Sequence, residues 1–225
     1  MTEFVRFPRT PHLVWLARQN ARKDKVLAPG EVREFLQRDI VVEEKVDGTN
    51  IGFSLDSTGA LRVQSRGDYL RRDSHPQFQQ LWSWLSARRD LLSRALSGDL
   101  ILFGEWCFAV HSVRYDRLPD WFLAFDIYER GPGSFWSTDR KNRWLDDLGI
   151  KRVPEIARGR FSLESLLSLL GRSQVGSGLM EGLYLRQDSG ERLAARAKIV
   201  RPEFVEEIGA HWSSRRLDRN SLLNA

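Results

Sequence analysis

Hydrophobic and polar positions in the first part of the chain follow the short, β-branched pattern of strands. Apolar runs of strand length lie at 40–46, 51–55 and 61–64. The turn residues Asp47-Gly48 and Ser57-Thr58-Gly59 separate them, which predicts antiparallel strands joined by tight turns. We therefore expect a strand, a tight turn and a strand to frame residues 45–50.

The pattern then changes to helical spacing. From Pro76 to about Leu96, apolar residues recur at intervals that predict one core-facing helix, which Gly98 ends. Further along, the sequence predicts strands at 100–106 and 121–128. Two helices follow, one from Ser137 or Thr138 to Gly149 and one over 162–170 that Gly171 ends. The last part predicts a hairpin of 183–186 and 193–200 around 188–190, and then a terminal helix opened by Pro202.

Short strands in hairpins with segregated helices predict an α+β fold, with antiparallel β-sheets flanked by helices. The sequence has no Gly-x-Gly-x-x-Gly or Gly-x-x-x-x-Gly-Lys element, so a Rossmann or P-loop fold is disfavoured. It also has no internal repeat and no long Gly/Ser-rich linker, which favours one domain over residues 1–225.

Composition narrows the class of protein. The chain is 41% hydrophobic and 29% charged, enough to bury a sizeable core. Its single cysteine, Cys107, cannot form an intramolecular disulfide, so a reducing compartment is the simplest expectation. No apolar run has the length of a signal peptide core or a membrane span. We expect a soluble cytoplasmic protein that does not enter a membrane.

The balance of charge favours a polyanionic partner. Lysine plus arginine is 35 and aspartate plus glutamate is 30, which gives a net charge of +5. Residues 62–94 hold seven arginines and three aspartates, so this segment alone carries +4. Within it, Arg71 and Arg72 follow Tyr69 and suit contact with phosphate groups. Arg88 and Arg89 are better explained as a solvated helix face.

The segment Glu43-Glu44-Lys45-Val46-Asp47-Gly48-Thr49-Asn50 holds the strongest chemical signal. Burial and nearby cations lower the pKa of a lysine and so increase the neutral amine, which is the nucleophilic form. Lys45 could then attack an electrophile such as phosphorus. The alternative is an ordinary hairpin, in which Asp47-Gly48 forms the turn and the lysine pairs with a neighbouring glutamate.

Lys-x-Asp-Gly is the signature of covalent nucleotidyltransferases, the polynucleotide ligases and mRNA capping enzymes. Other segments resemble further motifs of that superfamily in its order. They are Ser65-Arg66-Gly67, Phe103-Gly104-Glu105-Trp106, Phe125-Asp126-Ile127-Tyr128, Glu181-Gly182-Leu183-Tyr184-Leu185-Arg186 and Arg196-Ala197-Lys198. Glu-Lys-x-Asp-Gly-Thr-Asn, with segments 111–115, 118–122 and 200–204, resembles the ATP-dependent RNA ligase family in particular. The resemblance extends from about residue 7 to 220 and implies a ligase-type, ATP-grasp-like nucleotidyltransferase domain.

The resemblance also implies roles for individual residues. Lys45 would attack the α-phosphate of ATP, with help from Asp47, and Lys198 would neutralise the charge that develops. Glu181 would bind a divalent metal, Mg2+ or Mn2+. The remaining ATP or AMP contacts would come from Glu44 at the adenine amino group, Arg66 and Glu105 at ribose or phosphate, Phe125 by stacking on the purine, and Asn50 and Arg196. Arg196 departs from the family, which usually has lysine there. Arg71 and Arg72 would contact RNA.

The resemblance implies an ATP-dependent RNA ligase that joins 3′-hydroxyl and 5′-phosphate ends of RNA through lysyl-AMP, in RNA repair. About twenty residues follow the last motif, so we expect no appended OB-fold. DNA ligases and capping enzymes usually need one, which counts against those two alternatives. A catalytically silent nucleic-acid-binding module is the third, and the intact lysine and acidic motifs count against it. Recognition of RNA ends would come from this domain or from a partner protein.

Overall fold

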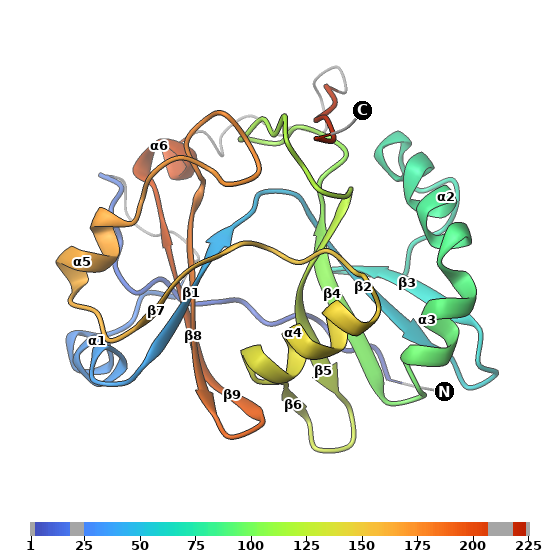
Figure 1. Cartoon of the computed structure of the whole chain (residues 1–225), viewed down its shortest axis with the longest axis horizontal. Helices are drawn as coiled ribbons and strands as arrows, with labels where there is room; N and C mark the ends of the chain where they lie inside the picture. Colours follow the sequence, from blue (N-terminus) through green and yellow to red (C-terminus); the bar gives the residue numbers. More distant parts are fainter. Residues whose placement is uncertain (1–2, 19–24, 207–217, 224–225) are drawn as a thin grey trace.

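The computed structural model describes residues 3–18, 25–206 and 218–223. Two antiparallel sheets form its centre (Figure 1). The first has the order β7-β1-β8-β9, with β1 at Ile40–Lys45, β7 at Glu155–Gly159, β8 at Gly182–Ser189 and β9 at Arg192–Val200. The second has the order β3-β2-β4-β5-β6, with β2 at Thr49–Leu55, β3 at Leu61–Ser65, β4 at Leu100–Trp106, β5 at Phe122–Glu129 and β6 at Ser134–Phe135. The predicted α+β class with antiparallel sheets is confirmed.

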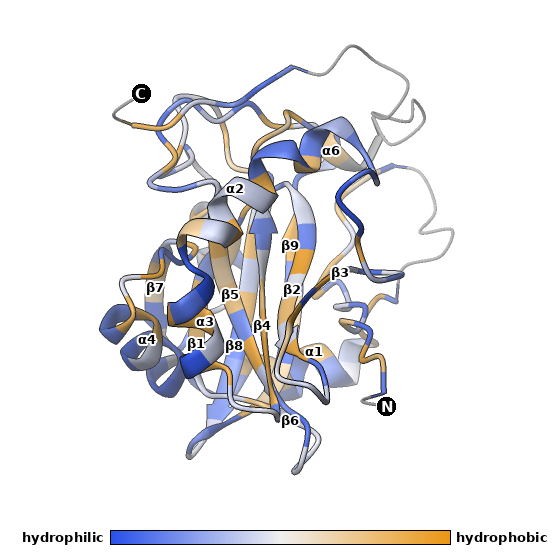
Figure 2. Cartoon of the chain, turned by 90° about the vertical axis from the view of Figure 1, so that its right-hand side faces the viewer, coloured by the Kyte–Doolittle hydropathy of each residue, from blue (hydrophilic) through white to orange (hydrophobic). Residues whose placement is uncertain are grey.

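Helices cover the outer faces of both sheets (Figures 1 and 2). Their bounds are α1 Pro29–Leu36, a 3-10 turn Pro76–Phe78, α2 Gln79–Ala87, α3 Arg89–Ala95, α4 Thr138–Asp147, α5 Leu163–Ser168 and α6 Pro202–Glu206. Helices α1 and α5 pack on the first sheet, and α2 and α3 pack on the second. No helix in the described part of the chain is long and apolar enough to cross a membrane.

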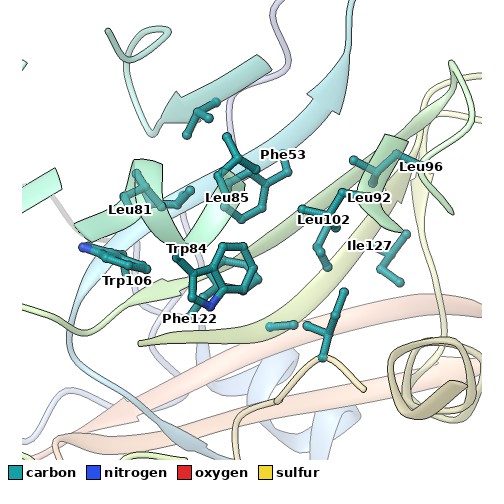
Figure 3. Packing of buried hydrophobic residues seen from close by; sticks show 14 of the residues in the cluster. Phe53, Leu81, Trp84, Leu85, Leu92, Leu96, Leu102, Trp106, Phe122 and Ile127 are labelled. Carbon is teal, nitrogen blue, oxygen red and sulfur yellow. The ribbon is translucent and has the colours of Figure 1, made fainter. Parts of the chain in front are cut away.

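The largest core cluster lies between the second sheet and helices α2 and α3 (Figure 3). At its centre the Trp84 ring stacks on Phe53 at a centroid distance of 5.4 Å and packs against Phe122 at 5.2 Å. Trp106 is fully buried beside them, and its indole Nε1 donates to the carbonyl of Gln77. Aromatic pairs at such separations add to the stability that burial provides.

The helix predicted over residues 76–96 is a 3-10 turn followed by two helices, so the prediction of one continuous helix was wrong. The break lies at Arg88, whose backbone has φ −115° and ψ 9°. Arg88 stacks over Trp84 and donates to Asp120 at 2.8 Å. The bend allows Leu92 of the second helix to enter the same core cluster as Leu85 of the first.

The prediction of a hairpin around residues 45–50 was also wrong. Strand β1 pairs with β7 and β8, whereas β2 pairs with β3 and β4, so this segment is a crossover from one sheet to the other. A Cβ atom on Gly48 would lie 2.8 Å from the carbonyl oxygen of Trp106. Gly48 is therefore required by the close approach of the crossover to β4, and not by a two-residue turn.

The remaining predicted strands and helices are confirmed within a few residues of their expected ends. The β8–β9 hairpin is longer than predicted, and Gly190 at its turn has φ +56°, which favours glycine. Gly149 has φ +66° after α4, as a helix-ending glycine should, whereas Gly171 does not adopt the left-handed conformation. Strands β6 and β7 and helix α1 were not predicted.

Candidate active site

A cavity of about 170 Å³ lies between the two sheets, beside the crossover. Its walls combine charged, polar and aromatic side chains from both sheets and from the N-terminal segment. Its lining residues include six side chains predicted to contact the nucleotide, together with the predicted nucleophile: Glu44, Lys45, Asn50, Arg66, Glu105, Phe125 and Lys198. Because the chain crosses between sheets at residues 45–50, strands distant in sequence bring these side chains together.

Lys45 is the last residue of β1 and is held by an acid that directly precedes the neighbouring strand β8. Its Nζ donates to Oε2 of Glu181 at 2.5 Å, and the two side chains are 25% and 13% exposed. Lys45 pairs with Gly182 in the β1–β8 register, which places Glu181 beside it. Burial alone would lower the pKa of Lys45, but Glu181 and Asp47 outweigh burial and raise it. The expectation of a lowered pKa was therefore wrong, and Lys45 is held as an ammonium.

Two acceptor oxygens in the cavity wall have no hydrogen-bond partner. Asn50 on β2 pairs with Glu105 on β4, and the buried Oδ1 of Asn50 and Oε2 of Glu105 both lack a donor. Burial raises the pKa of Glu105 to about 8, and the nearby Asp47 also raises it. Buried polar groups in native proteins are normally paired, so these oxygens fit a ligand with hydroxyl groups, which can both donate and accept hydrogen bonds.

Glu44 is buried and already bound at both carboxylate oxygens. Ser173 Oγ donates to Oε1 at 2.5 Å and the backbone N–H of Gln174 donates to Oε2 at 2.8 Å. Burial raises the pKa of Glu44, and these two hydrogen bonds oppose the rise. The loop at Ser173–Gln174 thus fixes Glu44 in the cavity wall, and no motif in the sequence indicated this loop.

An irregularity in β5 shapes the aromatic wall. Phe103 pairs with Asp126 and Gly104 pairs with Ala124, so Phe125 is an extra residue in the β4–β5 ladder. This bulge allows Phe125 to line the cavity while the next residue, Asp126, reaches charged groups deeper in the interior. Phe125 packs edge-on against Phe7 at 5.1 Å. Phe7, from the N-terminal segment, was not predicted as part of the site.

Two cations line the cavity from opposite sheets. Arg66 follows β3 and is exposed, whereas Lys198 lies on β9 opposite Tyr184. The N-terminal segment fixes this part of β9, because the N–H of Lys198 donates to the carbonyl of Pro11 at 2.9 Å and the N–H of Leu13 donates to the carbonyl of Lys198 at 2.8 Å. Cations on two sides suit a ligand with several negative charges.

Asp47 is fixed by a loop rather than lining the cavity. Its Oδ2 accepts from the N–H of Ser112 at 2.6 Å and of Val113 at 3.1 Å, and its own N–H donates to Tyr115 Oη at 2.8 Å. His111 Nδ1 lies 4.0 Å from Oδ1 of Asp47. The sequence contained this loop within the family resemblance, but nothing in it indicated contact with Asp47.

A C-terminal residue in turn fixes that loop. Asn220 is 5% exposed, its Oδ1 accepts from the N–H of Tyr115, and its Nδ2 donates to the carbonyls of Cys107 and Ala109. Asn220 thus satisfies three backbone groups on the segment that leads to and follows the Asp47-binding residues. It is a distant member of the site that sequence motifs could not identify.

Arg196 does not line the cavity. Its guanidinium donates to Oδ2 of Asp126 at 3.1 Å and stacks over Phe135 at 4.0 Å and Phe7 at 5.1 Å. Phe7, which it supports, does line the cavity, and the contact of Arg196 with the nucleotide stays a prediction.

Arg71 and Arg72 lie outside the cavity. Both side chains are exposed, and the Arg72 guanidinium stacks over Trp82 of α2 at 5.6 Å. Their predicted role in RNA binding stays a prediction.

The described residues offer at most a partial metal site. Within the described residues, no group of three or more His, Cys, Asp or Glu side chains is placed to hold one. Magnesium usually keeps several waters and takes one or two carboxylates together with substrate phosphates. Glu181, which interacts electrostatically with Glu105, fits such a partial site.

Comparisons with known proteins agree with this geometry. A family model described as RNA ligase matches residues 38–200. Among solved structures, a Naegleria gruberi RNA ligase mutant with ATP and Mn superposes with a TM-score of 0.63 at 19% identity, covering 79% of this chain and 54% of that one. A mutant of that ligase with AMP and Mn gives 0.68 at 18% identity, covering 92% and 58%. The ligase with PPi gives 0.61 at 19% identity, covering 89% and 63%.

The chain thus spans between half and two thirds of the length of these structures. At such identities the likeness shows a shared fold. No curated protein sequence gave a significant match.

Proposed function

The chain belongs to the RNA ligase family, and from this premise we propose that it is an ATP-dependent enzyme that joins RNA 3′-hydroxyl and 5′-phosphate ends. The observation that supports this most is the position of Lys45. It ends β1 at the crossover between the sheets and lines a cavity that also contains cations and unpartnered acceptors. The cavity therefore offers a nucleophile, cations for the phosphates of a nucleotide, and polar oxygens for its sugar hydroxyls.

In the proposed first step, Lys45 is adenylylated. Its nitrogen attacks the α-phosphorus of ATP, the bond to pyrophosphate breaks, and a lysyl-AMP phosphoramidate remains. Lys45 must first leave its ion pair with Glu181 and lose a proton, because only the neutral amine attacks. Lys198 is suited to neutralise charge on the phosphate as it becomes pentacoordinate, and Asp47 acts at or after this step.

The cavity walls support binding of the nucleotide. Phe125 offers a ring face for stacking on the adenine. Glu44 lines the same cavity, and we propose that it recognises the amino nitrogen of the adenine. The acceptors of Asn50 and Glu105 suit ribose hydroxyls, and Arg66 suits a phosphate. Arg196 acts by supporting Phe7 and Asp126.

Glu181, near Glu105, would hold a divalent cation, and Mg2+ or Mn2+ bound there supplies neutralisation of triphosphate charge. The structures matched above include ATP and Mn in the Naegleria ligase. The chain's own contribution is to offer carboxylate oxygens next to Lys45 without a complete metal cage.

In the later proposed steps, AMP passes to an RNA 5′-phosphate and a 3′-hydroxyl then displaces it. We place this activity in repair of broken RNA in the cytoplasm, where RNA and ATP are both available. Arg71 and Arg72 are proposed to contact the RNA backbone, since both are exposed and lie close in sequence to Arg66 at the cavity.

Incubation with α-labelled ATP and Mg2+ tests the proposal. Wild type should acquire acid-labile label, Lys45→Ala should acquire none, and Lys151→Ala, which removes an exposed lysine, should match wild type. An unlabelled wild type, or a fully labelled Lys45→Ala variant, would contradict the assignment. Transfer of the label to nicked RNA, nicked DNA or single strands then separates RNA ligase from DNA ligase activity.

A further inference from the structure

A second concave surface lies at the edge of the second sheet, apart from the cavity of Lys45. A hollow of about 600 Å³ borders edge strand β3, and another of about 490 Å³ adjoins it because Trp82 lines both. We call the two together the Trp82 groove. The side chains that define its chemistry are Phe4, Arg62, Tyr69, Arg72 and Trp82.

Two arginines lie on aromatic rings in the Trp82 groove. The Arg62 guanidinium lies over Tyr69 at 5.1 Å and the Arg72 guanidinium lies over Trp82 at 5.6 Å. Phe4 meets the Tyr69 ring edge-on at 5.1 Å. Unpaired nucleobases stack on aromatic rings and on guanidinium planes alike, so each of these pairs can be extended by a base.

Polar atoms in the Trp82 groove also lack partners. Both Tyr69 Oη and Trp82 Nε1 are buried without a hydrogen bond. An apolar protein segment would leave these atoms unsatisfied, whereas the edge of a base or a sugar hydroxyl offers acceptors to both.

The charge around the Trp82 groove selects a polyanion. Residues 62–73 include Arg62, Arg66, Arg71 and Arg72 against Asp68 and Asp73, which gives 4 − 2 = +2. Asp56 is 3.6 Å from Arg62, so one acid from the β2–β3 turn offsets part of this charge. Aromatic surfaces interleaved with an excess of arginine are typical of sites for single-stranded nucleic acid.

Strand β3 connects the Trp82 groove with the proposed active site. Arg66 lines the cavity and follows β3, and Arg62 lies four residues earlier on the same strand. Four residues of strand span about 13 Å. A single RNA strand of a few nucleotides is long enough to contact both arginines.

We propose that the Trp82 groove binds single-stranded RNA on the way to the end that reacts at Lys45. This rests on the proposed function for the choice of RNA and for the direction of the strand. It assigns to this chain a substrate-binding surface of its own, formed by β3, α2 and the N-terminal segment.

Binding of a ten-nucleotide oligoadenylate, measured by fluorescence anisotropy without ATP, tests the groove directly. Tyr69→Leu removes a ring face but keeps an apolar side chain, and Arg72→Ala removes a surface guanidinium. Each should weaken binding by at least about fivefold, the lower end of what one stacked base contributes. Arg72→Ala should also reduce the slope of log affinity against log salt by about 0.7. The matched control is Arg89→Ala, which removes the same charge from the exposed face of α3 and should stay within about twofold of wild type.

Self-adenylylation of each variant, which involves no RNA, reports folding and separates this proposal from the first. If wild type forms no adduct, the proposed function fails, and the anisotropy comparison still decides the groove. If Tyr69→Leu does not fold, Arg72→Ala alone decides it. Equal affinities for Arg72→Ala, Arg89→Ala and wild type would overturn the proposal. A loss confined to duplex RNA would overturn it as well, because it would show a backbone contact without base stacking.

Discussion

Strand β1 contributes to two lysine–glutamate pairs that differ in how completely the protein surrounds them. Lys141 of α4 donates to Oε1 of Glu43 at 2.6 Å, and the two side chains are 0% and 2% exposed. Two residues further on, Lys45 donates to Glu181 at 2.5 Å with both side chains partly exposed at the cavity. Burial lowers the pKa of Lys141, and that of Lys45 is raised by the acids around it.

The neighbours of each pair explain the contrast. Glu43 Oε2 lies 4.0 Å from the Arg186 guanidinium, which also binds Asp126 at 2.7 Å. Asp126 in turn binds Arg196, so the first pair belongs to a buried network in which cations and carboxylates alternate. Lys45 instead shares the cavity lining with Glu105, one oxygen of which has no hydrogen-bond partner. Glu43 Oε2 also lacks a hydrogen bond, so the two pairs differ in exposure and not in complete pairing. The first pair is enclosed by protein charges, whereas the second is partly exposed at the cavity, where a ligand can reach it.

The largest predicted effect is a loss of stability when the buried Lys141–Glu43 pair is broken. Lys141→Met leaves the Glu43 carboxylate buried without its cation, which should lower the free energy of unfolding by about 3–5 kcal/mol in urea denaturation. Lys45→Met, the same substitution at the cavity, should lower it by less than about 1 kcal/mol, since water reaches the remaining acid. Self-adenylylation should show the reverse order, with no adduct only for Lys45→Met.

A double variant checks the cause. Glu43→Leu combined with Lys141→Met removes both charges and should recover much of the lost stability, because a buried ion pair can often be replaced by apolar side chains. If the double variant is less stable than Lys141→Met, the loss comes from packing rather than from an unpaired charge.

Asn220 extends the comparison to a buried side chain that is uncharged and fully hydrogen-bonded to the backbone. Asn220→Ala leaves three backbone groups of the loop at Cys107–Tyr115 without partners, and thermal unfolding should show a loss of about 3 kcal/mol. Leu223→Ala, three residues away and 60% exposed before substitution, should change stability by less than about 0.5 kcal/mol. Similar melting of the two variants would remove Asn220 from the account.

Gly48→Ala tests the crossover that separates the two pairs. The added Cβ would meet the Trp106 carbonyl oxygen at 2.8 Å, and the backbone must shift at a cost of about 2 kcal/mol. Gly67→Ala is the control, because a Cβ there meets nothing within 4 Å. If both variants unfold at the same urea concentration, the crossover does not depend on this close approach.

A further effect concerns the cavity and depends on pH. The folded-state pKa of Glu105, raised to about 8 from an ordinary value of 4.5, means that the folded protein binds this proton more tightly than the unfolded chain. Stability should therefore fall as pH rises from about 5 to 8, and Glu105→Gln should remove this part of the dependence. Denaturation midpoints of both proteins across that range should diverge with Glu105→Gln above wild type at pH 8. Parallel curves would contradict the shift.

Local patterns predicted most strands and the partners of strands joined by short turns, namely β2 with β3 and β8 with β9, but not the partners of β1. The β-branched run before Asp47-Gly48 marks β1, yet the same pattern precedes either a hairpin or a crossover. Lys45 pairs with Gly182, and such a long-range choice depends on packing of whole sheets. Strand β7 was missed because it lacks alternation: four of its five residues are only partly buried. The single helix over 76–96 was predicted because a periodic pattern continues through the break at Arg88.

The candidate site shows the same limit. The family resemblance predicted that Lys45, Glu105 and Lys198 belong to one site, and all three line the cavity. The pKa of Lys45 could not be predicted, since it depends on acids from other elements. Asn220 and the Ser173–Gln174 loop act through backbone contacts that have no sequence pattern.

Locating the AMP adduct tests directly whether Lys45 is the nucleophile. Wild-type protein is incubated with ATP and Mg2+, digested under conditions that preserve a phosphoramidate, and sequenced by tandem mass spectrometry. The account predicts AMP on Lys45 and on no other lysine, including Lys141, whose ammonium is enclosed by the buried network. AMP on another residue, or no AMP on any peptide, would contradict it.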